Sequence, residues 1–529
     1  MSQLLARFAA RSDDPRTAVL DATGAHTYAS IVRRAAAVSA ALSTSRPLEL
    51  AHERVALFAE PGADFISGFF GILLAGGCVV VLSPLHPAPE TRYFCADAGV
   101  RTVLVSAALR DHASALEGTC ELRDLASAAA TPTDVDARAL AERVADSSPA
   151  LQLYTSGTTG RPKGAVLTHA NIGIQQQLVG DAWGFSQSDV LLHALPLHHM
   201  HGLAIALLTA LGAGAATRMR SFEAPAIWDE MADATVFMGV PAMYHRLFVA
   251  FDAATADQRE RWAANAKKLR LATSGSAALP VTLAERWRAL TGNIPLERFG
   301  MTEIGVGITN ALHGPRFAGC VGLPLPTVET RIVGDAATDA GSKAGTGERG
   351  EHPRDAETGE LWIRGPSVFA GYHGKEEETK KAFAPDPDGG APWFRTGDTV
   401  TRDRSLEGAP FKILGRSSVD ILKSGGYKLS ALEIEEVLRE HAAVAEVAVV
   451  GVPDEAWGEK VVACVIRRGD AACTPADLKA FTRERLAPYK VPKEFVFVAE
   501  LPKNALGKTV KPELVRRLQL HPPSPTPGS

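Results

Sequence analysis

A loop rich in glycines, hydroxyls and basic side chains is the first part of the sequence suited to chemistry. It lies within LYTSGTTGRPKGAVLTH (153–169), between two apolar runs. Glycines let a backbone approach an anion closely, and successive N–H groups then form a nest for phosphate, to which Lys163 adds a cation. A flexible linker is the alternative, although linkers rarely combine so many donors with flanking strand-like runs. A Walker A loop is excluded because it needs GxxxxGKS or GxxxxGKT, whereas Gly160 is followed by Arg-Pro-Lys-Gly.

Length and composition limit the class of protein. At 529 residues the chain exceeds what one hydrophobic core usually supports, so we expect two or more domains. Its 60 acidic residues against 56 lysines and arginines give a formal charge of −4, which argues against nucleic acid as a partner. The six cysteines show neither a CxxC pair nor a zinc spacing, as expected of reduced thiols in a cytoplasmic protein. Glycines and β-branched residues in the most apolar run (65–83) predict a helix leading into a buried strand, and no membrane span.

Helical and strand patterns alternate from residue 17 to about residue 325. Short apolar runs such as RVALFAE, GCVVVLSP and RTVLVS are separated by helix-like stretches such as TYASIVRRAAAVSAALS, which predicts an α/β core with a parallel or mixed sheet. Short strands with turns follow from residue 328 and predict a β-rich subdomain. Helices and strands then alternate again and predict a small α+β domain. We expect an N-terminal domain over 1–415, a C-terminal domain over 416–520 and a disordered tail over 521–529.

Seven ordered segments resemble the motifs of the adenylate-forming superfamily, which includes acyl-CoA synthetases, peptide-synthetase adenylation domains and luciferases. The resemblance spans residues 17–515. The segments are YTSGTTGRPKGAVLTH (154–169), LPLHHMHGL (195–203), ATSGSAAL (272–279), RFGMTEIG (298–305), FRTGDTV (394–400), GRSSVDILKSGGYKLSALEIE (415–435) and PKNALGKTVK (502–511). The resemblance implies an enzyme that joins a carboxylate to the α-phosphate of ATP, releases pyrophosphate, and passes the acyl group to coenzyme A.

The resemblance assigns residues to the nucleotide. Cations, hydroxyls and Mg²⁺ are needed around the phosphates because the barrier is mainly one of charge and alignment. Thr302 is expected at the α-phosphate, Glu303 at Mg²⁺, and Asp398 at the ribose hydroxyls. The residues that the resemblance assigns to ATP are Thr155, Ser156, Gly157, Thr158, Thr159, Gly160, Lys163, Gly275, Ser276, Ala277, Phe299, Gly300, Met301, Thr302, Asp398 and Arg416.

The C-terminal motif assigns catalysis to Lys508. A lysine near a chain end is usually solvated, but the PxxxxGK setting resembles the family lysine that bridges the substrate carboxylate and the α-phosphate. The family also implies that the C-terminal domain is mobile and rotates after adenylation to admit CoA. GRSSVD is one residue longer than the common GRxKD pattern, so the hinge is placed only near Asp420. The residues assigned to the hinge and to CoA are Asp420, Lys423, Gly425, Gly426 and Tyr427.

The acid substrate is indicated by strings such as ATVFMGVPAMYHRL and LAPYKVP, which look most like malonyl-CoA synthetases. Malonate keeps a second carboxylate, whose burial without a cation would cost several kcal/mol. Arg298 suits it as a bidentate partner, unless Arg298 instead pairs with Glu297. Arg246 is a second candidate. His201 is expected to shape the pocket wall with its neighbouring histidines rather than bind metal, and Met301 to limit the α-substituent so that methylmalonate also fits.

Two alternatives remain open at this point. The enzyme could activate a short-chain or aryl monocarboxylate, or it could load a separate carrier protein. No carrier segment with its serine follows Lys511. The expected partners are the acid, ATP and CoA, and the expected assembly is a monomer or a homodimer.

Overall fold

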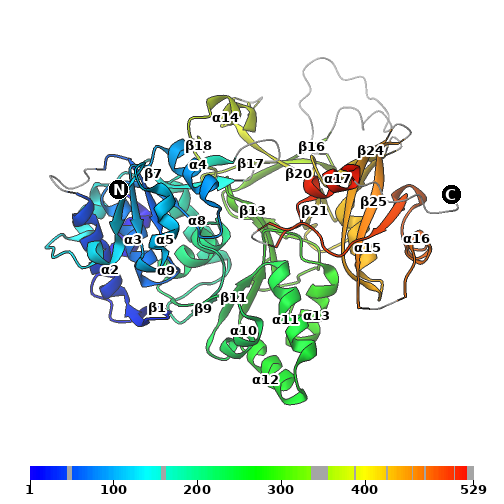
Figure 1. The fold of residues 1–529 in the computed structure, drawn as a ribbon, viewed down its shortest axis with the longest axis horizontal. Helices are drawn as coiled ribbons and strands as arrows, with labels where there is room; N and C mark the ends of the chain where they lie inside the picture. The colour runs from blue at the N-terminus through cyan, green and yellow to red at the C-terminus, as the bar shows by residue number, and fades with distance from the viewer. Residues whose placement is uncertain are drawn as a thin grey trace.

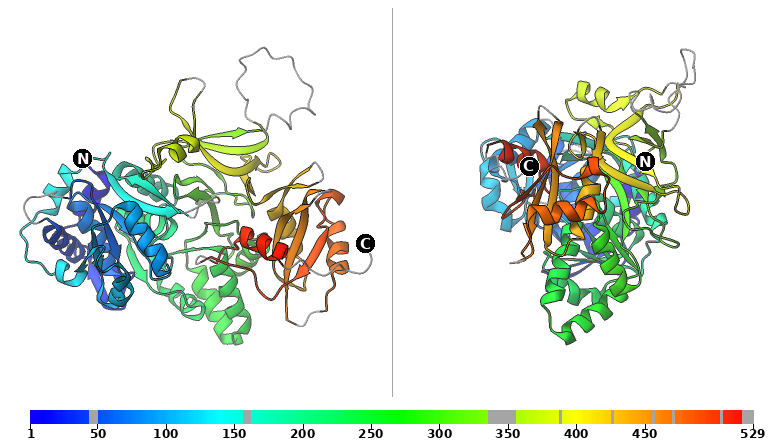
Figure 2. Two further views of the ribbon diagram at one scale, coloured as in Figure 1. Left: turned by 45° about the horizontal axis from the view of Figure 1, so that its top comes forward. Right: turned by 90° about the vertical axis from the view of Figure 1, so that its right-hand side faces the viewer.

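The computed structural model describes residues 1–43, 50–155, 162–334, 356–386, 389–424, 427–454, 457–469, 472–504 and 507–520. The N-terminal α/β part lies at the left and bottom of Figure 1, a β-rich part lies at the upper middle, and an α+β part lies at the right. The other two views keep this division (Figure 2). Residues 335–355, between the first strands of the β-rich part, and the predicted tail (521–529) lie outside the described residues.

The first α/β sheet has the strand order β18-β8-β7-β4-β3-β5-β6 and is parallel except at β8 and β18. Its strands are β3 (Arg54–Phe58), β4 (Cys78–Val81), β5 (Thr102–Val105), β6 (Glu121–Asp124), β7 (Pro149–Thr155), β8 (Lys163–Thr168) and β18 (Gly371–Tyr372). The helices of this part are α1 (Gln3–Ala9), α2 (Tyr28–Leu42), α3 (Ala63–Leu74), α4 (Ala88–Ala98), α5 (Arg110–Ala113), α6 (Leu125–Ala129), α7 (Ala137–Arg143) and α8 (His169–Ala182), with short 3₁₀ turns at Ala107–Leu109 and Ser114–Leu116.

The second α/β sheet has the order β15-β14-β13-β12-β11-β9-β10-β1-β2. Its strands are β1 (Thr17–Asp21), β2 (Gly24–Thr27), β9 (Val190–His193), β10 (Ala216–Met219), β11 (Val236–Gly239), β12 (Leu271–Ser274), β13 (Leu296–Met301), β14 (Gly305–Thr309) and β15 (Leu323–Pro324). Its helical segments are the π-helical η3 (His201–Leu208), α9 (Thr209–Ala213), α10 (Ala224–Glu230), the 3₁₀ turn Met231–Asp233, α11 (Pro241–Ala253), α12 (Ala256–Lys267) and α13 (Val281–Thr291).

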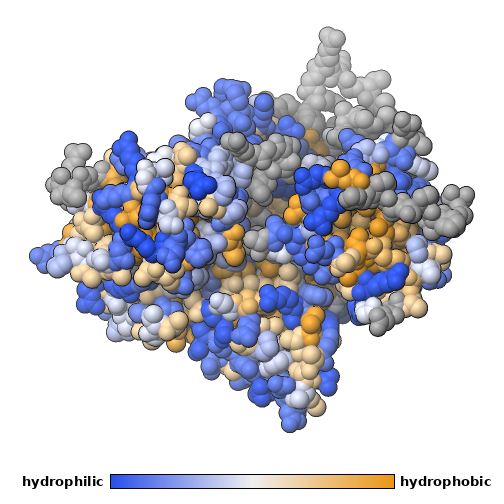
Figure 3. Space-filling model, viewed as in Figure 1, coloured by the Kyte–Doolittle hydropathy of each residue, from blue (hydrophilic) through white to orange (hydrophobic). Residues whose placement is uncertain are grey.

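The prediction that residues 65–83 form a helix followed by a buried strand is confirmed by α3 and β4. Both elements are almost completely buried because the sheet is covered on both faces. No helix in the described ranges combines the length and the apolar character needed to cross a membrane. Hydrophilic residues cover much of the face in Figure 3, and apolar residues gather over the C-terminal sheet at its right.

The β-rich part is an antiparallel sheet in which β16, β17, β20 and β19 are neighbours and β21 pairs with β20. Its elements are β16 (Glu329–Val333), β17 (Thr358–Arg364), α14 (Glu376–Ala382), β19 (Phe383–Ala384), β20 (Trp393–Arg402) and β21 (Phe411–Arg416). Its last strand leads directly into the C-terminal part.

The C-terminal part is built on a sheet with the order β23-β22-β25-β24, to which β26 adds beside β25. Its elements are β22 (Ile421–Ser424), β23 (Tyr427–Ser430), α15 (Ala431–Arg439), β24 (Val444–Asp454), β25 (Gly458–Arg467), α16 (Pro475–Arg483), the 3₁₀ turn Pro488–Lys490, β26 (Glu494–Phe497) and α17 (Lys511–Leu520). Separate apolar clusters lie on its two faces, since β-strand side chains alternate between them. The α/β, β-rich and α+β architecture predicted from the sequence is therefore confirmed.

Candidate active site

The glycine-rich loop is flanked by a β-hairpin. Strands β7 and β8 pair antiparallel, and Thr155 lies opposite Lys163 at the end of the pair. Ser156, Gly157, Thr158, Thr159 and Gly160 lie outside the described residues, so their expected contacts with phosphate stay predictions. The described ends of the hairpin place Lys163 beside the ring of Tyr372, with Nζ 5.2 Å from the ring centroid.

Glu303 lies in the turn between β13 and β14 and contacts Tyr372, the same residue that Lys163 contacts. Its side chain is buried, and Oε1 accepts a hydrogen bond from the Tyr372 hydroxyl at 2.8 Å. Burial raises the pKa of Glu303, while the Tyr372 hydroxyl and the charges of Arg416 and Lys163 oppose that shift. Thr302 precedes it and is half-buried. The structure thus brings Glu303 and Lys163 together through one tyrosine.

Tyr372 is the residue that the sequence analysis missed. It lies on the short strand β18, which pairs with β8, and the neighbouring Phe369 N–H donates to the Glu303 carbonyl at 2.7 Å. The preceding segment is held by Asn171 on α8, whose amide donates to the Pro366 and Val368 carbonyls, each at 2.9 Å. A two-residue strand so far from its partner in the chain leaves no local pattern that could have revealed it.

Replacing Tyr372 with phenylalanine should lower acid-dependent ATP–pyrophosphate exchange about tenfold and raise the magnesium concentration needed for half-maximal exchange. The reason is that Glu303 loses a hydrogen bond to a charged acceptor, which contributes about 1.5–3 kcal/mol. Exchange measured across a magnesium titration tests this. Phe383→Leu serves as a control, since Phe383 packs near the same aromatic cluster but donates no hydrogen bond to Glu303. An unchanged magnesium dependence would exclude the role of Tyr372.

Asp398 and Arg416 lie opposite each other on two neighbouring strands. They are register partners in β20 and β21, and Arg416 Nε lies 3.2 Å from Asp398 Oδ1. Burial raises the pKa of Asp398, and the positive charges of Arg416 and Lys508 oppose that shift. A buried carboxylate with one oxygen on a guanidinium keeps acceptor capacity for the ribose hydroxyls of a nucleotide.

Lys508 lies close enough to Asp398 to favour its charged form. The segment that carries Lys508 closes on itself, because Asn504 Oδ1 accepts the Lys508 N–H at 3.0 Å and the Lys508 carbonyl accepts the Asn504 N–H at 2.9 Å. It rests on the N-terminal end of α11, where a Cβ placed on Gly507 would lie 3.0 Å from that of Ala242. The lysine side chain is exposed and free to meet a ligand in this orientation.

The carboxylate of Glu303 fits a magnesium ion that is shared with a phosphate. Among the described residues there is no group of three or more His, Cys, Asp or Glu side chains that could hold a metal. Magnesium is usually held by one or two carboxylates together with waters and substrate phosphates, so a single buried Glu303 near Lys163 suits it.

Arg298 is a buried cation that has no counter-ion among the described residues. Its side chain on β13 is 7% exposed, and Nε and Nη2 have no hydrogen-bond partner among the described residues. Glu297 does not pair with it: the Glu297 carboxylate accepts the Gly319 N–H at 2.9 Å, and burial raises its pKa to about 8. Burial also lowers the pKa of Arg298, to about 10, which leaves the guanidinium charged at neutral pH.

The turn after β12 borders this guanidinium. A Cβ on Gly275 would lie 2.5 Å from Arg298 Nε and Cζ, so only glycine leaves room for the guanidinium there. Ser276 has a left-handed backbone (φ 68°), and its hydroxyl lies 3.2 Å from His201 Nδ1. His201 is the first residue of η3, and burial together with the Arg298 charge lowers its pKa well below the usual value. Neutral imidazole and charged guanidinium thus share one buried site.

The remaining predicted residues have other environments. Phe299 is buried, and Gly300 is required where its Cβ would lie 2.1 Å from the Gly305 carbonyl oxygen. Met301 is half-buried at the end of β13, and Ala277 is exposed after β12.

Arg246 has a different environment from Arg298. It is exposed on α11, with its guanidinium 4.6 Å from the Phe222 ring centroid. No contact in the described part of the chain joins it to Arg298 or His201. This environment favours Arg298 over Arg246 as the partner of the second carboxylate, and the assignment of Arg246 to the acid substrate stays a prediction.

Of the residues assigned to the hinge and to CoA, the structure describes Asp420, Lys423 and Tyr427. Asp420 is buried just before β22. The Lys423 N–H donates to Glu459 Oε2 at 2.5 Å, and exposed Tyr427 stacks on Tyr489 with ring centroids 4.4 Å apart. Gly425 and Gly426 lie outside the described residues. In this orientation Tyr427 contacts its own part of the molecule.

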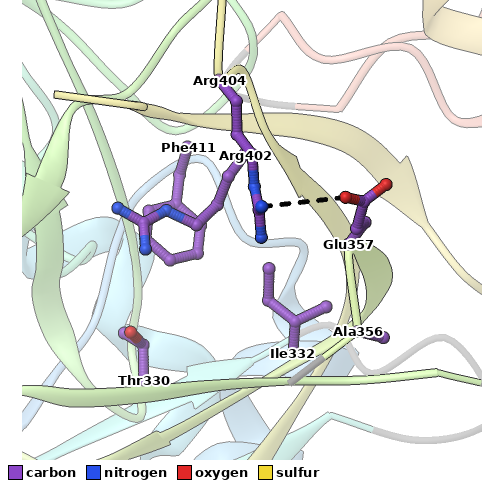
Figure 4. A pocket seen from close by; sticks show the side chains of 7 residues that line it. All are labelled: Thr330, Ile332, Ala356, Glu357, Arg402, Arg404 and Phe411. Carbon is purple, nitrogen blue, oxygen red and sulfur yellow. Dashed lines mark ion pairs between the residues drawn. The ribbon is translucent and has the colours of Figure 1, made fainter. Parts of the chain in front are cut away.

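Two surface cavities lie apart from the residues described above. One, of about 180 Å³, is lined by strands of the β-rich part, with Arg404 paired to Glu357 and Arg402 over Phe411 (Figure 4). The other, of about 250 Å³, lies beyond β3 and β4 and is bordered by His86. Neither is lined by Arg298, Glu303 or Asp398. The candidate site is therefore identified from its buried charged residues, and neither of these two cavities forms part of it.

Two family models match this chain. The AMP-binding enzyme model covers residues 5–373, which include Lys163, Arg298 and Glu303, and the AMP-binding enzyme C-terminal domain model covers residues 433–508, which end at Lys508. The chain belongs to the AMP-binding enzyme family. It is an AMP-forming acid–thiol ligase of the acyl-CoA synthetase type, which confirms the family and enzyme class predicted from the motifs.

Relatives in this family are similar over nearly the whole chain. The mitochondrial malonate–CoA ligase ACSF3 of Bos taurus is 38% identical, over 96% of this chain and 89% of the relative. The ATP-bound structure of MatB from Rhodopseudomonas palustris is 32% identical, with a TM-score of 0.82 over 97% of this chain and 99% of that one. A malonyl-CoA ligase in a ternary product complex with methylmalonyl-CoA and AMP is 34% identical, with a TM-score of 0.63 over 93% and 97% of the two chains.

Proposed function

We propose that this protein is an ATP-dependent malonate–CoA ligase that also accepts methylmalonate. The observation that carries the proposal is the buried Arg298 guanidinium, which has no protein counter-ion in the described structure. A free malonate carboxylate supplies that counter-ion through paired hydrogen bonds. A monocarboxylate would leave the cation unpaired, at a cost of several kcal/mol. Relatives named as malonate–CoA ligases support the same substrate.

The first half-reaction forms malonyl-AMP. One malonate carboxylate oxygen attacks the α-phosphorus of ATP, and the bond to the β-phosphate breaks as pyrophosphate leaves. Lys508 lies between the two anions as they meet, and Lys163 with the glycine-rich loop holds the leaving pyrophosphate. Asp398 and Arg416 hold the ribose. A magnesium ion bound by Glu303 would neutralise phosphate charge, and Tyr372 orients that carboxylate.

The second half-reaction transfers the malonyl group. The CoA sulfur attacks the acyl carbon, and the bond to AMP breaks. Rotation of the C-terminal unit (416–520) about the segment near Asp420 would withdraw Lys508 and bring Lys423 and Tyr427 toward the site. The similarity to an ATP-bound relative exceeds that to a product complex of comparable identity, which supports two orientations of this unit. Six free cysteines support a reducing compartment, so we propose a cytoplasmic location.

The decisive experiment is a panel of acids with purified protein, ATP, Mg²⁺ and CoA, read out as CoA thioester. Malonate should give the highest kcat/KM and methylmalonate a lower one, with acetate, butyrate and benzoate at least a hundredfold below malonate. Preference for any monocarboxylate would refute the proposed substrate. Thioester formed with a carrier protein in place of CoA would instead support the carrier-loading alternative. Size-exclusion chromatography of the same sample measures whether the enzyme is a monomer or a homodimer.

A further inference from the structure

Residues 417–420, here called the crossing, connect the β-rich sheet to the C-terminal sheet. One carboxylate in this segment makes contacts on both sides of it. Strand β21 ends at Arg416, and β22 begins at Ile421. Asp420, between them, uses its two oxygens in opposite directions. Oδ2 accepts the Arg416 N–H at 3.1 Å, on the side of the nucleotide residues, and Oδ1 lies 2.6 Å from the ammonium of Lys511, on the C-terminal side.

Lys511 joins this crossing to the C-terminal core. It is the first residue of α17 and is 8% exposed. Its Nζ also lies 2.7 Å from Oε1 of Glu435, a buried residue of α15 whose same oxygen accepts the Val449 N–H at 2.9 Å. Burial lowers the pKa of Lys511, but the Glu435 and Asp420 carboxylates raise it above the usual value, so the group stays charged.

A buried ion pair of this kind contributes little net stability, because desolvating the charges costs about as much as their attraction returns. Its value lies in fixing one geometry. Lys511 follows Lys508 by three residues, and the segment before it is closed by the bridge between Lys503 and Thr509. Helix α17 lies on the side of the C-terminal sheet that faces the rest of the molecule (Figures 1 and 2). The Lys508 segment therefore has a fixed anchor at the crossing itself.

We propose that Lys511 is a positioning residue that ties the Lys508 segment to the domain crossing through Asp420 and Glu435. The inference rests on the proposed role of Lys508 in adenylation. Rotation of the C-terminal unit about residues 417–420 would break the contact between Asp420 Oδ2 and the Arg416 N–H. The Lys511 contacts would persist, because Asp420, Glu435 and Lys511 then move together. The contacts of Lys511 with Asp420 and Glu435 thus keep the distance from the crossing to Lys508 constant in both orientations of the C-terminal unit.

The test is Lys511→Met in the full chain, with both half-reactions measured per folded molecule. Malonate-dependent ATP–pyrophosphate exchange should fall at least tenfold, while transfer from supplied malonyl-AMP to CoA should fall less than threefold. Lys490→Met is the control, since Lys490 also pairs with a glutamate of α15, Glu433, at 2.7 Å, although this pair is more exposed and does not include Asp420. It should change the two rates by the same small factor.

Equal losses in the two half-reactions of Lys511→Met, or the same unequal loss in Lys490→Met, would overturn the inference. The double variant Lys511→Met/Glu435→Gln also removes the charge of one of the two carboxylates that lose the Lys511 ammonium; Glu435 itself keeps a second partner in Arg439. The double variant is measured in the same way, so that poor folding of the single variant does not decide the result. Lys508→Ala is run beside them. Full exchange activity in Lys508→Ala would refute the proposed role of Lys508 in adenylation, whereas loss of exchange there with unchanged exchange in the Lys511 variants would refute the positioning role alone.

Discussion

Replacement of Arg298 by methionine is expected to reduce kcat/KM for malonate by about two orders of magnitude. Removing one partner of a buried, hydrogen-bonded charge pair costs about 3 kcal/mol or more, which corresponds to roughly a hundredfold. The free malonate carboxylate would then be buried against the stem of methionine, the neutral His201 and the Gly275 backbone, none of which carries a positive charge. The loss should appear with malonate and methylmalonate, and butyrate turnover should stay equal or rise.

The same substitution should stabilise the protein in the absence of substrate. In the wild type Arg298 is 7% exposed, and its Nε and Nη2 have no hydrogen-bond partner in the described part of the chain, so its desolvation cost is not offset until an anion binds. Methionine fills similar space without a charge. Thermal unfolding followed by circular dichroism should therefore show a higher Tm for the unliganded variant. Malonate should raise the Tm of the wild type alone, because ligand binding stabilises the folded state.

Arg246→Ala provides the comparison for this prediction. Arg246 is exposed over the Phe222 ring, so its loss should change kcat/KM for malonate by less than threefold. If Arg298→Met retained malonate turnover, or if Arg246→Ala lost as much, the assignment of the second carboxylate to Arg298 would fail. The acid panel measured on both variants distinguishes these results.

The α/β core could be predicted because its strands are buried on both faces. Strands such as β3, β4 and β5 are therefore short, continuous apolar runs that stand out without any knowledge of their neighbours. The antiparallel addition of β14 to β13 could not be predicted in the same way. Its residues fall in the glycine-rich segment after Glu303, where Gly300 and Gly305 meet at backbone distance. The two strands form a β-hairpin around residues 302–304, and the glycines on both sides of that turn interrupt the apolar alternation by which a strand is recognised.

The residues of the candidate site also differ in how clearly the sequence reveals them. Glu303, Asp398 and Lys508 could be named because each lies within a short motif. Tyr372 and Lys511 could not, since each acts through a partner far away in the chain: Glu303 is 69 residues from Tyr372, and Asp420 is 91 residues from Lys511. Arg298 is intermediate. Its position suggested an anion, but its lack of a counter-ion follows from the Glu297 side chain bonding to Gly319 instead.

Replacement of Lys508 by alanine is expected to separate the two half-reactions most sharply. Malonate-dependent ATP–pyrophosphate exchange should fall about a thousandfold, the upper range for removal of one preorganised charge-stabilising group. The ammonium favours the charged form of Asp398 and belongs to a segment that contacts α11. In the proposed function it relieves repulsion between malonate and the α-phosphate. Transfer of the malonyl group from supplied malonyl-AMP to CoA should stay within threefold of wild type, because no second anion has to approach the phosphate.

Lys503→Ala is the matched control for Lys508→Ala. Lys503 precedes Lys508 in the same segment and pairs with Glu446 at 2.6 Å, so it tests whether any lost lysine there disturbs the segment. Both half-reactions of this variant should remain within threefold of wild type. Rapid-quench single turnovers with radiolabelled ATP and with malonyl-AMP measure the two steps separately. Parallel loss of both steps in Lys508→Ala would mean that Lys508 holds the fold of its segment and does not serve adenylation. A loss confined to the first step would instead show that the Lys508 charge relieves the repulsion between malonate and the α-phosphate during adenylation.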